Sequence, residues 1–162
     1  MTIAQLTARM IAFSEGNTHD SDHLLKVWAY AKTIGELEGL DEETQFTLEL
    51  AALTHDIARA LCREKYGAAL WDKQEQEGAP MVRQFLSDTD LSDACIERVA
   101  YLVGHHHTLS NIDGMDYQIL IEADFLVNAV EKGLHKNEAA DFIGKYFRTE
   151  SALSLAKALF TL

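Results

Sequence analysis

The chain has few residues of the kinds that cross-link proteins or interrupt helices. It contains two cysteines and one proline among 162 residues. Cys62 and Cys95 lie far apart and form no C-x-x-C motif, so we expect reduced thiols and no disulfide framework. No apolar run approaches the roughly 20 residues needed to cross a bilayer, and the first residues lack the features of a signal peptide. These absences predict a cytoplasmic protein without a membrane-spanning segment.

Basic residues are also scarce. Fourteen lysines and arginines stand against 26 aspartates and glutamates, which gives a formal net charge of −12 at pH 7. A strongly acidic chain binds DNA or RNA poorly, because such binding depends on neutralising backbone phosphates. We therefore expect no nucleic acid polymer as a partner. A local basic patch or a bound cation could still hold a small phosphorylated molecule.

Apolar residues at helical spacing are abundant. No segment shows a sustained two-residue alternation bounded by hairpin turns, so the sequence predicts an all-α fold. Pro80 is expected to begin or redirect a helix. No repeat or linker divides the chain, which predicts a single helical domain over residues 1–162. The predicted helices cover about 2–14, 20–38, 41–58, 71–86, 90–107, 115–131, 135–147 and 150–160.

Two histidines and an aspartate continue the apolar faces of predicted helices. His23 precedes Val27 and Ile34 at helical spacing, so its side chain is expected to point inward. His55 shares a stripe with leucine and alanine residues, and Asp56 lies on the neighbouring stripe. Taken singly, His23 is more often a hydrogen-bonded core histidine, and the pair His55 and Asp56 more often has a capping or surface role.

Asp124 is a more informative residue. It lies in the middle of "ILIEADFLVNAV", which is apolar on nearly all sides and therefore predicts a buried helix. A buried carboxylate without a partner costs several kcal/mol, so a salt bridge, a proton or a metal ion must neutralise it. Glu122 and Asn128 on the same helix are expected nearer its rim.

Together, two imidazoles and two carboxylates are expected on three inward-facing helices. His23, His55, Asp56 and Asp124 supply two nitrogen and two oxygen ligands. This set suits a six-coordinate Mn²⁺, Fe²⁺, Co²⁺, Ni²⁺ or Mg²⁺ with positions open to water, rather than a closed, sulfur-rich zinc site. The sequence therefore predicts a divalent metal site.

The segments "HDSDHLLKV", "ELAALTHDI" and "ILIEADFLVN" resemble the HD-domain family of metal-dependent phosphohydrolases. The family motif is a histidine, a His-Asp pair and a distant aspartate, matched in order by His23, His55, Asp56 and Asp124 over roughly residues 19–132. The resemblance implies an HD-domain-like helical bundle. It also implies hydrolysis of a small phosphorylated metabolite, most often a nucleotide.

Some members of this family hold a second metal ion through further histidines. The segment "WDKQEQEGAPMV" has none, which argues against a two-metal site. In "GHHHT", His106 is expected to turn inward beside His105, and either could bind a second ion or a substrate phosphate. The alternative is a helix-end cluster that contacts solvent and carbonyl groups. His107 is expected to face water, and His19 ranks below His23 as a ligand.

Two basic residues are candidates to bind a phosphate. Lys26 lies one helical turn after His23, where many relatives carry arginine, whose planar guanidinium binds phosphate through two contacts. Arg59 lies one turn beyond Asp56. A salt bridge to Asp56 or a solvated surface charge is the alternative for Arg59.

These residues suggest phosphate ester or anhydride hydrolysis. The metal ion activates a water molecule, while Lys26, Arg59, His105 and His106 compensate charge on the phosphoryl oxygens. Three alternatives stay open: a regulatory module that binds metal and nucleotide without hydrolysis, oxidation at a di-iron site, and an interaction protein with coincidental polar residues. The last helices could close the bundle or form a homodimer contact.

Overall fold

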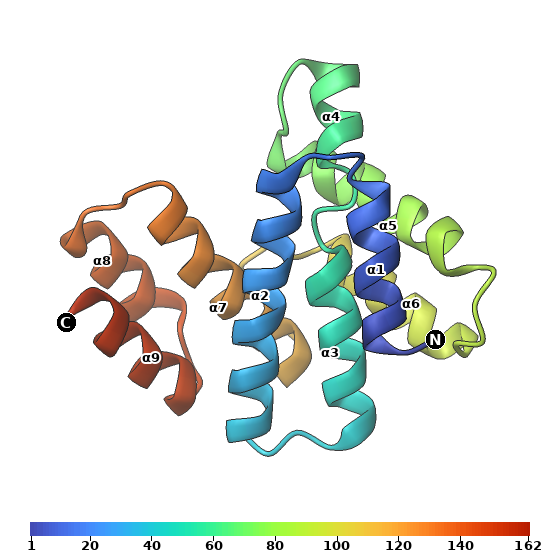
Figure 1. Ribbon diagram of the computed structural model, residues 1–162. Helices are drawn as coiled ribbons and strands as arrows, with labels where there is room; N and C mark the ends of the chain where they lie inside the picture. Colours follow the sequence, from blue (N-terminus) through green and yellow to red (C-terminus); the bar gives the residue numbers. More distant parts are fainter.

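The computed structural model describes residues 1–162 and contains nine helices and no strand, which confirms the predicted all-α fold. Figure 1 shows their arrangement. The helices are α1 (Ile3–Phe13), α2 (Thr18–Leu37), α3 (Glu42–Thr54), α4 (Arg59–Tyr66), α5 (Trp71–Leu86), α6 (Asp93–Val103), α7 (Met115–Glu131), α8 (Lys136–Tyr146) and α9 (Glu150–Phe160).

Helices α2, α3 and α7 form the centre of the bundle. Each of these three helices contacts the other two, and α1 packs against α3. The pair α5 and α6 lies on one side and the pair α8 and α9 on the other (Figure 1). One continuous apolar core joins these helices, and it includes Leu6, Ile34, Leu50, Val99, Leu120 and Ala152. No helix is both long enough and apolar enough to span a bilayer.

Two predicted helices are shorter than expected, and both stop next to predicted site residues. The predicted helix 41–58 ends at Thr54, and a separate helix, α4, begins at Arg59. Between them, the amide of Arg59 donates to the carbonyl of Asp56 in a tight turn. The predicted helix 90–107 covers only residues 93–103, and the three histidines that follow lie in turns. Because of these breaks, the directions of the histidine side chains do not follow the spacing of an α-helix.

Pro80 lies inside α5, so it does not begin a helix. A proline in a helix interior removes one backbone hydrogen bond, which leaves the carbonyl four residues earlier without its usual partner. Both Pro80 and Gln76 are exposed, so water can reach that carbonyl. The helix therefore continues past the proline.

Candidate metal centre

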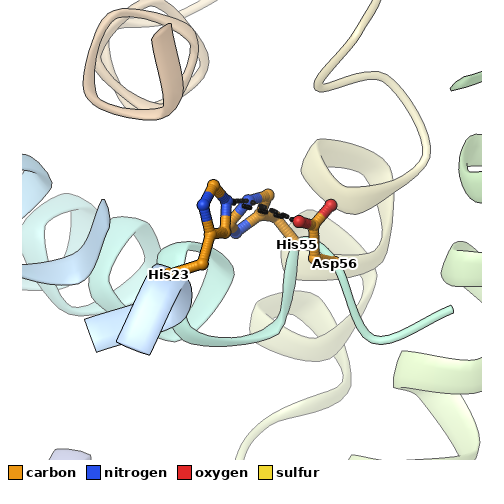
Figure 2. A group of neighbouring side chains, drawn as sticks. All are labelled: His23, His55 and Asp56. Carbon is orange, nitrogen blue, oxygen red and sulfur yellow. Dashed lines mark hydrogen bonds and ion pairs between the residues drawn. The ribbon is translucent and has the colours of Figure 1, made fainter. Parts of the chain in front are cut away.

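Three parts of the bundle bring the predicted metal ligands together. His23 comes from the first half of α2, His55 and Asp56 from the turn after α3, and Asp124 from the middle of α7. His23 and His55 are buried and Asp124 is 6% exposed. Figure 2 shows the rings of His23 and His55 and the carboxylate of Asp56 facing one another. The structure thus places all four residues at one point in the interior.

The distances between the four side chains suit a shared cation. His23 Nε2 lies 3.3 Å from His55 Nε2, 3.2 Å from Asp124 Oδ1 and 3.3 Å from Asp56 Oδ2. His55 Nε2 lies 3.3 Å from Asp124 Oδ1 and 3.6 Å from Asp56 Oδ2. Ligands that bind one cation at right angles stand about 3 Å apart. His23, His55 and Asp56 present ligand atoms within 4.8 Å of one another, and Asp124 adds an oxygen beside both rings. This spacing suits a divalent ion held by the two rings and a carboxylate.

Hydrogen bonds at the far side of each ring orient both histidines. His55 Nδ1 lies 2.8 Å from the carbonyl oxygen of Ala52, and His23 Nδ1 lies 3.0 Å from Glu131 Oε2. Because a ring nitrogen must donate a proton to these oxygens, Nε2 of each neutral ring carries a lone pair toward the centre. Two lone pairs facing each other need a proton or a cation between them. The arrangement fits a metal ion.

The charges of the site are balanced by the same residues. Burial disfavours the charged form of His23, but hydrogen bonding to Asp124 and the charge of Asp56 raise its pKa. Burial and the two carboxylates act on His55 in the same way, and its pKa is also raised. The pKa values of Asp56 and Asp124 are lowered despite burial, because the histidines stabilise their charged forms. The negative charge of the two buried carboxylates can thus be neutralised either by protons on the histidines or by a divalent cation.

A second group of possible ligands adjoins the first. Asp56 Oδ1 lies 3.5 Å from His106 Nε2, while its other oxygen, Oδ2, faces His23 and His55. Asp56, His106 and His107 present ligand atoms within 4.8 Å of one another. Nε2 of both His106 and His107 is buried and has no hydrogen-bond partner. The Asp56 carboxylate could therefore bridge two cations.

His107 faces this group, so the expectation that it faces water is wrong. Burial, followed by the neighbouring His106, lowers the pKa of His107 to about 3, which leaves the ring neutral and able to bind a cation. On α5, where the sequence offered no histidine, Gln74 is buried and its Oε1 has no partner. The absence of a histidine in that segment is therefore a weaker argument against a second ion than the sequence suggested.

The structure does not bring His105 into either group. Its Nδ1 lies 2.7 Å from the carbonyl oxygen of Tyr101, and its ring stacks on the Tyr101 ring at 4.1 Å. His106, by contrast, is buried, as expected. The helix ends at Val103, and consecutive residues of the following turn point in different directions. A role for His105 at a substrate phosphate is therefore not supported.

The two basic residues predicted to bind phosphate lie in different surroundings. Lys26 Nζ donates to Glu131 Oε1 at 2.8 Å, and Glu131 in turn contacts the ring of His23. Lys26 is therefore linked to a predicted metal ligand only through Glu131. Arg59 Nη1 lies 3.0 Å from Asp56 Oδ2, which is the ion pair expected as its alternative role. Arg59 also lines a pocket beside the metal centre, whereas Lys26 does not. Arg59 is therefore the better placed of the two.

The sequence analysis did not identify Glu131, and it placed Glu122 of the same helix incorrectly. Asp124, Asn128 and Glu131 follow one another at intervals of four and three residues, which places them on one helix face. Asn128 Nδ2 donates to Asp124 Oδ1 at 2.7 Å. Glu122 does not lie at the rim, because it is fully buried and accepts hydrogen bonds from the backbone of Thr149. The spacing was the signal that could have identified Glu131.

A pocket of about 490 Å³ opens directly beside the metal centre. Asp56, Asp124, His106 and His107 form part of its lining. The remaining lining comes mainly from α7, the segment after it and the start of α5, and α8 contributes Phe142. A small molecule in this pocket would therefore contact the candidate ligands.

The comparisons with known proteins agree with this fold. The sequence model of the HD domain matches residues 20–157. A crystal structure of a predicted HD superfamily hydrolase from an uncultured Thermotogales bacterium superposes with a TM-score of 0.69 at 23% identity, covering 98% of this chain and 83% of that chain. No curated protein matches the sequence. With its match over most of its length and its His, His-Asp and Asp residues gathered at one point, the chain belongs to the HD domain family.

Proposed function

We propose that the protein is a metal-dependent phosphohydrolase that acts on a small phosphorylated metabolite. The observation that carries this proposal is the convergence of two histidines and two carboxylates on one point at the edge of a 490 Å³ pocket. The similar crystal structure is described as a predicted hydrolase, which supports the same reaction class. Nucleotides, the substrates that the family resemblance implies, are the first compounds to test.

His23, His55, Asp56 and Asp124 would hold the ion, and Asp56, His106 and His107 could hold a second one. The oxygen and nitrogen ligands suit Mn²⁺, Fe²⁺, Co²⁺, Ni²⁺ or Mg²⁺. Such an ion supplies a nucleophilic water at neutral pH and polarises a phosphoryl oxygen.

Arg59 is the side chain best placed to bind the phosphoryl group. Its guanidinium lines the pocket and is held by Asp56 at 3.0 Å and by Asp20 at 3.8 Å. Arg59 Nε is buried without a hydrogen-bond partner, so a donor remains for a ligand oxygen. A positioned guanidinium stabilises negative charge that develops on a phosphoryl group.

Replacing Asp56 tests the proposal because this carboxylate belongs to both ligand groups. Asp56→Ala should abolish metal content and the release of phosphate from a panel of phosphate esters and nucleotides assayed with Mn²⁺, Mg²⁺ or Ni²⁺. Asp22→Ala, at an exposed position on α2, is the matched control and should behave like the parent protein. A fully active Asp56→Ala protein would refute the proposal.

The same panel separates hydrolysis from regulation. If the metal-loaded protein bound a phosphorylated compound without releasing phosphate or pyrophosphate, the regulatory module would be supported instead.

A further inference from the structure

The lining of the pocket is apolar away from the metal centre. Its wall is formed by Leu109, Ile121, Phe125, Ala129, Leu134 and Phe142. The rings of Phe125 and Phe142 stack in parallel, with centroids 3.9 Å apart and an angle of 3° between the planes. Trp71 adds a further aromatic ring, which is 63% exposed and stacks on His107 at 5.4 Å. A ligand that reaches the metal centre must therefore place its other end against aliphatic and aromatic carbon.

This wall offers few hydrogen bonds to a hydroxyl-rich ligand. Asn128 lines the pocket, but its amide nitrogen already donates to Asp124. The amide nitrogen of Gln74 donates to the carbonyl of Ala69, which leaves Gln74 Oε1 as an unpaired acceptor. Hydroxyl groups that lose water without gaining partners weaken binding. The amides of Asn128 and Gln74 are thus the main hydrogen-bonding groups along this wall, which is few for a sugar-like group with several hydroxyls.

The positive charge of the pocket is also limited. Arg59 and Lys132 are its two lysine or arginine side chains. Arg59 is shared by Asp56 and Asp20, whereas Lys132 is an exposed residue whose Nζ lies 5.7 Å from the Trp71 ring centroid. One phosphate monoester carries nearly two negative charges at neutral pH, and a triphosphate carries more. Beyond any metal ion, the side chains of the pocket therefore supply little positive charge for a second or third phosphate group, which favours a ligand with one phosphate.

From this lining we infer that the substrate is a phosphate monoester whose organic group is aromatic or otherwise apolar. The inference rests on the proposed function. Hydrolysis of this monoester consumes one water, breaks the bond between phosphorus and the ester oxygen, and releases inorganic phosphate and the alcohol. The phosphate lies at the metal centre and Arg59, and the organic group lies along Phe125 and Phe142.

A matched pair of esters tests this preference. 3-Phenylpropyl phosphate and glycerol 3-phosphate are both monoesters of primary alcohols, so their ester bonds have similar intrinsic reactivity. With Mn²⁺ present, we expect a KM at least about tenfold lower for the phenylpropyl ester, because burial of a phenyl ring favours binding by that factor or more. We expect a lower kcat/KM for ATP than for either monoester. Equal KM values for the two monoesters would overturn the inference.

A binding experiment removes catalysis from the test. 3-Phenylpropylphosphonate, which has no ester bond, should bind the Mn²⁺-loaded protein more tightly than methylphosphonate in calorimetry. Phe142→Ala should weaken the first interaction about tenfold and leave the second unchanged. Phe85→Ala, a part-buried ring that packs against Phe13 and Arg9 outside the pocket, is the control. Leu134→Ala provides a second pocket variant if Phe142→Ala does not fold.

The outcomes separate the two proposals. Selective binding of the phenylpropyl phosphonate without hydrolysis of any ester would support the pocket inference and overturn the proposed phosphohydrolase function. Hydrolysis of both monoesters with no preference, and no effect of Phe142→Ala or Leu134→Ala, would overturn the pocket inference alone.

Discussion

At the scale of single residues, we expect Glu131 to position His23 as a metal ligand without binding the ion itself. It accepts from Lys26 Nζ and lies 3.0 Å from His23 Nδ1. Partners of this kind fix the tautomer of a metal-binding histidine, and their loss typically weakens metal binding 10- to 100-fold. Glu131→Ala should therefore weaken Mn²⁺ binding by about that factor in calorimetry. Glu64→Ala, at an exposed position on α4, should have no effect, and equal affinities of the two variants would refute this role.

The histidine pair makes the stability of the metal-free protein depend on pH. Despite burial, the carboxylates of Asp124 and Asp56 raise the pKa values of His23 and His55 above the ordinary value of 6.5. The stabilising effect of their protonation is complete below pH 6.5 and is lost as the pH rises through the raised pKa values. The Tm of the metal-free protein should thus fall above pH 6.5. In a His23→Gln variant this fall should be smaller, and an equal fall in both proteins would contradict the assignment.

Metal binding should show the opposite pH dependence. A cation must displace the protons from His23 and His55, so the affinity for Mn²⁺ should increase as the pH rises above 6.5. Titrations at several pH values between 6 and 9 would measure this. An affinity independent of pH would show that the two rings are not ligands.

The sequence contained enough information to predict the proximity of His23, His55, Asp56 and Asp124, because the motif and the apolar setting of Asp124 pointed to one interior site. It did not predict that His107 would face the site. That orientation depends on where α6 ends, and the helical periodicity continued past Val103. The direction of a side chain in a turn follows from tertiary contacts rather than from residue spacing.

At the scale of elements, the break after α3 is what presents the His-Asp pair to the site. Thr54 is the last residue of the helix, and its hydroxyl donates to the carbonyl of Leu50. No glycine or proline marks this break in the sequence, so the helix was predicted to run on to residue 58 and α4 was missed. The long helices α2, α5 and α7 were predicted to within two residues of their observed bounds, and glycines mark two of these ends, Gly39 after α2 and Gly114 before α7.

Helix α7 is connected to the start of α9 through one buried carboxylate. Glu122 accepts hydrogen bonds from the amides of Arg148 and Thr149 and from the Thr149 hydroxyl. Glu122→Ala would leave these donors without a partner, and we expect a loss of about 3 kcal/mol in the free energy of unfolding. Urea denaturation would measure it. Glu150→Ala, at an exposed position in the first turn of α9, is the control, and a loss below about 0.5 kcal/mol for Glu122→Ala would contradict this role.

At the scale of the whole molecule, a net charge of −12 should keep the protein away from polyanions. We expect no measurable binding to duplex DNA in fluorescence anisotropy at physiological salt. Salt-sensitive binding at micromolar protein concentration would contradict this expectation.

A titration with Mn²⁺, followed by the loss of the free-ion EPR signal, tests whether the two ends of the motif share a cation. We predict at least one bound Mn²⁺ per chain in the parent protein and a large loss of affinity in both His23→Ala and Asp124→Ala, because each removes a ligand from the same ion. Full binding by either variant, or no binding by the folded parent protein, would contradict the assignment of this site.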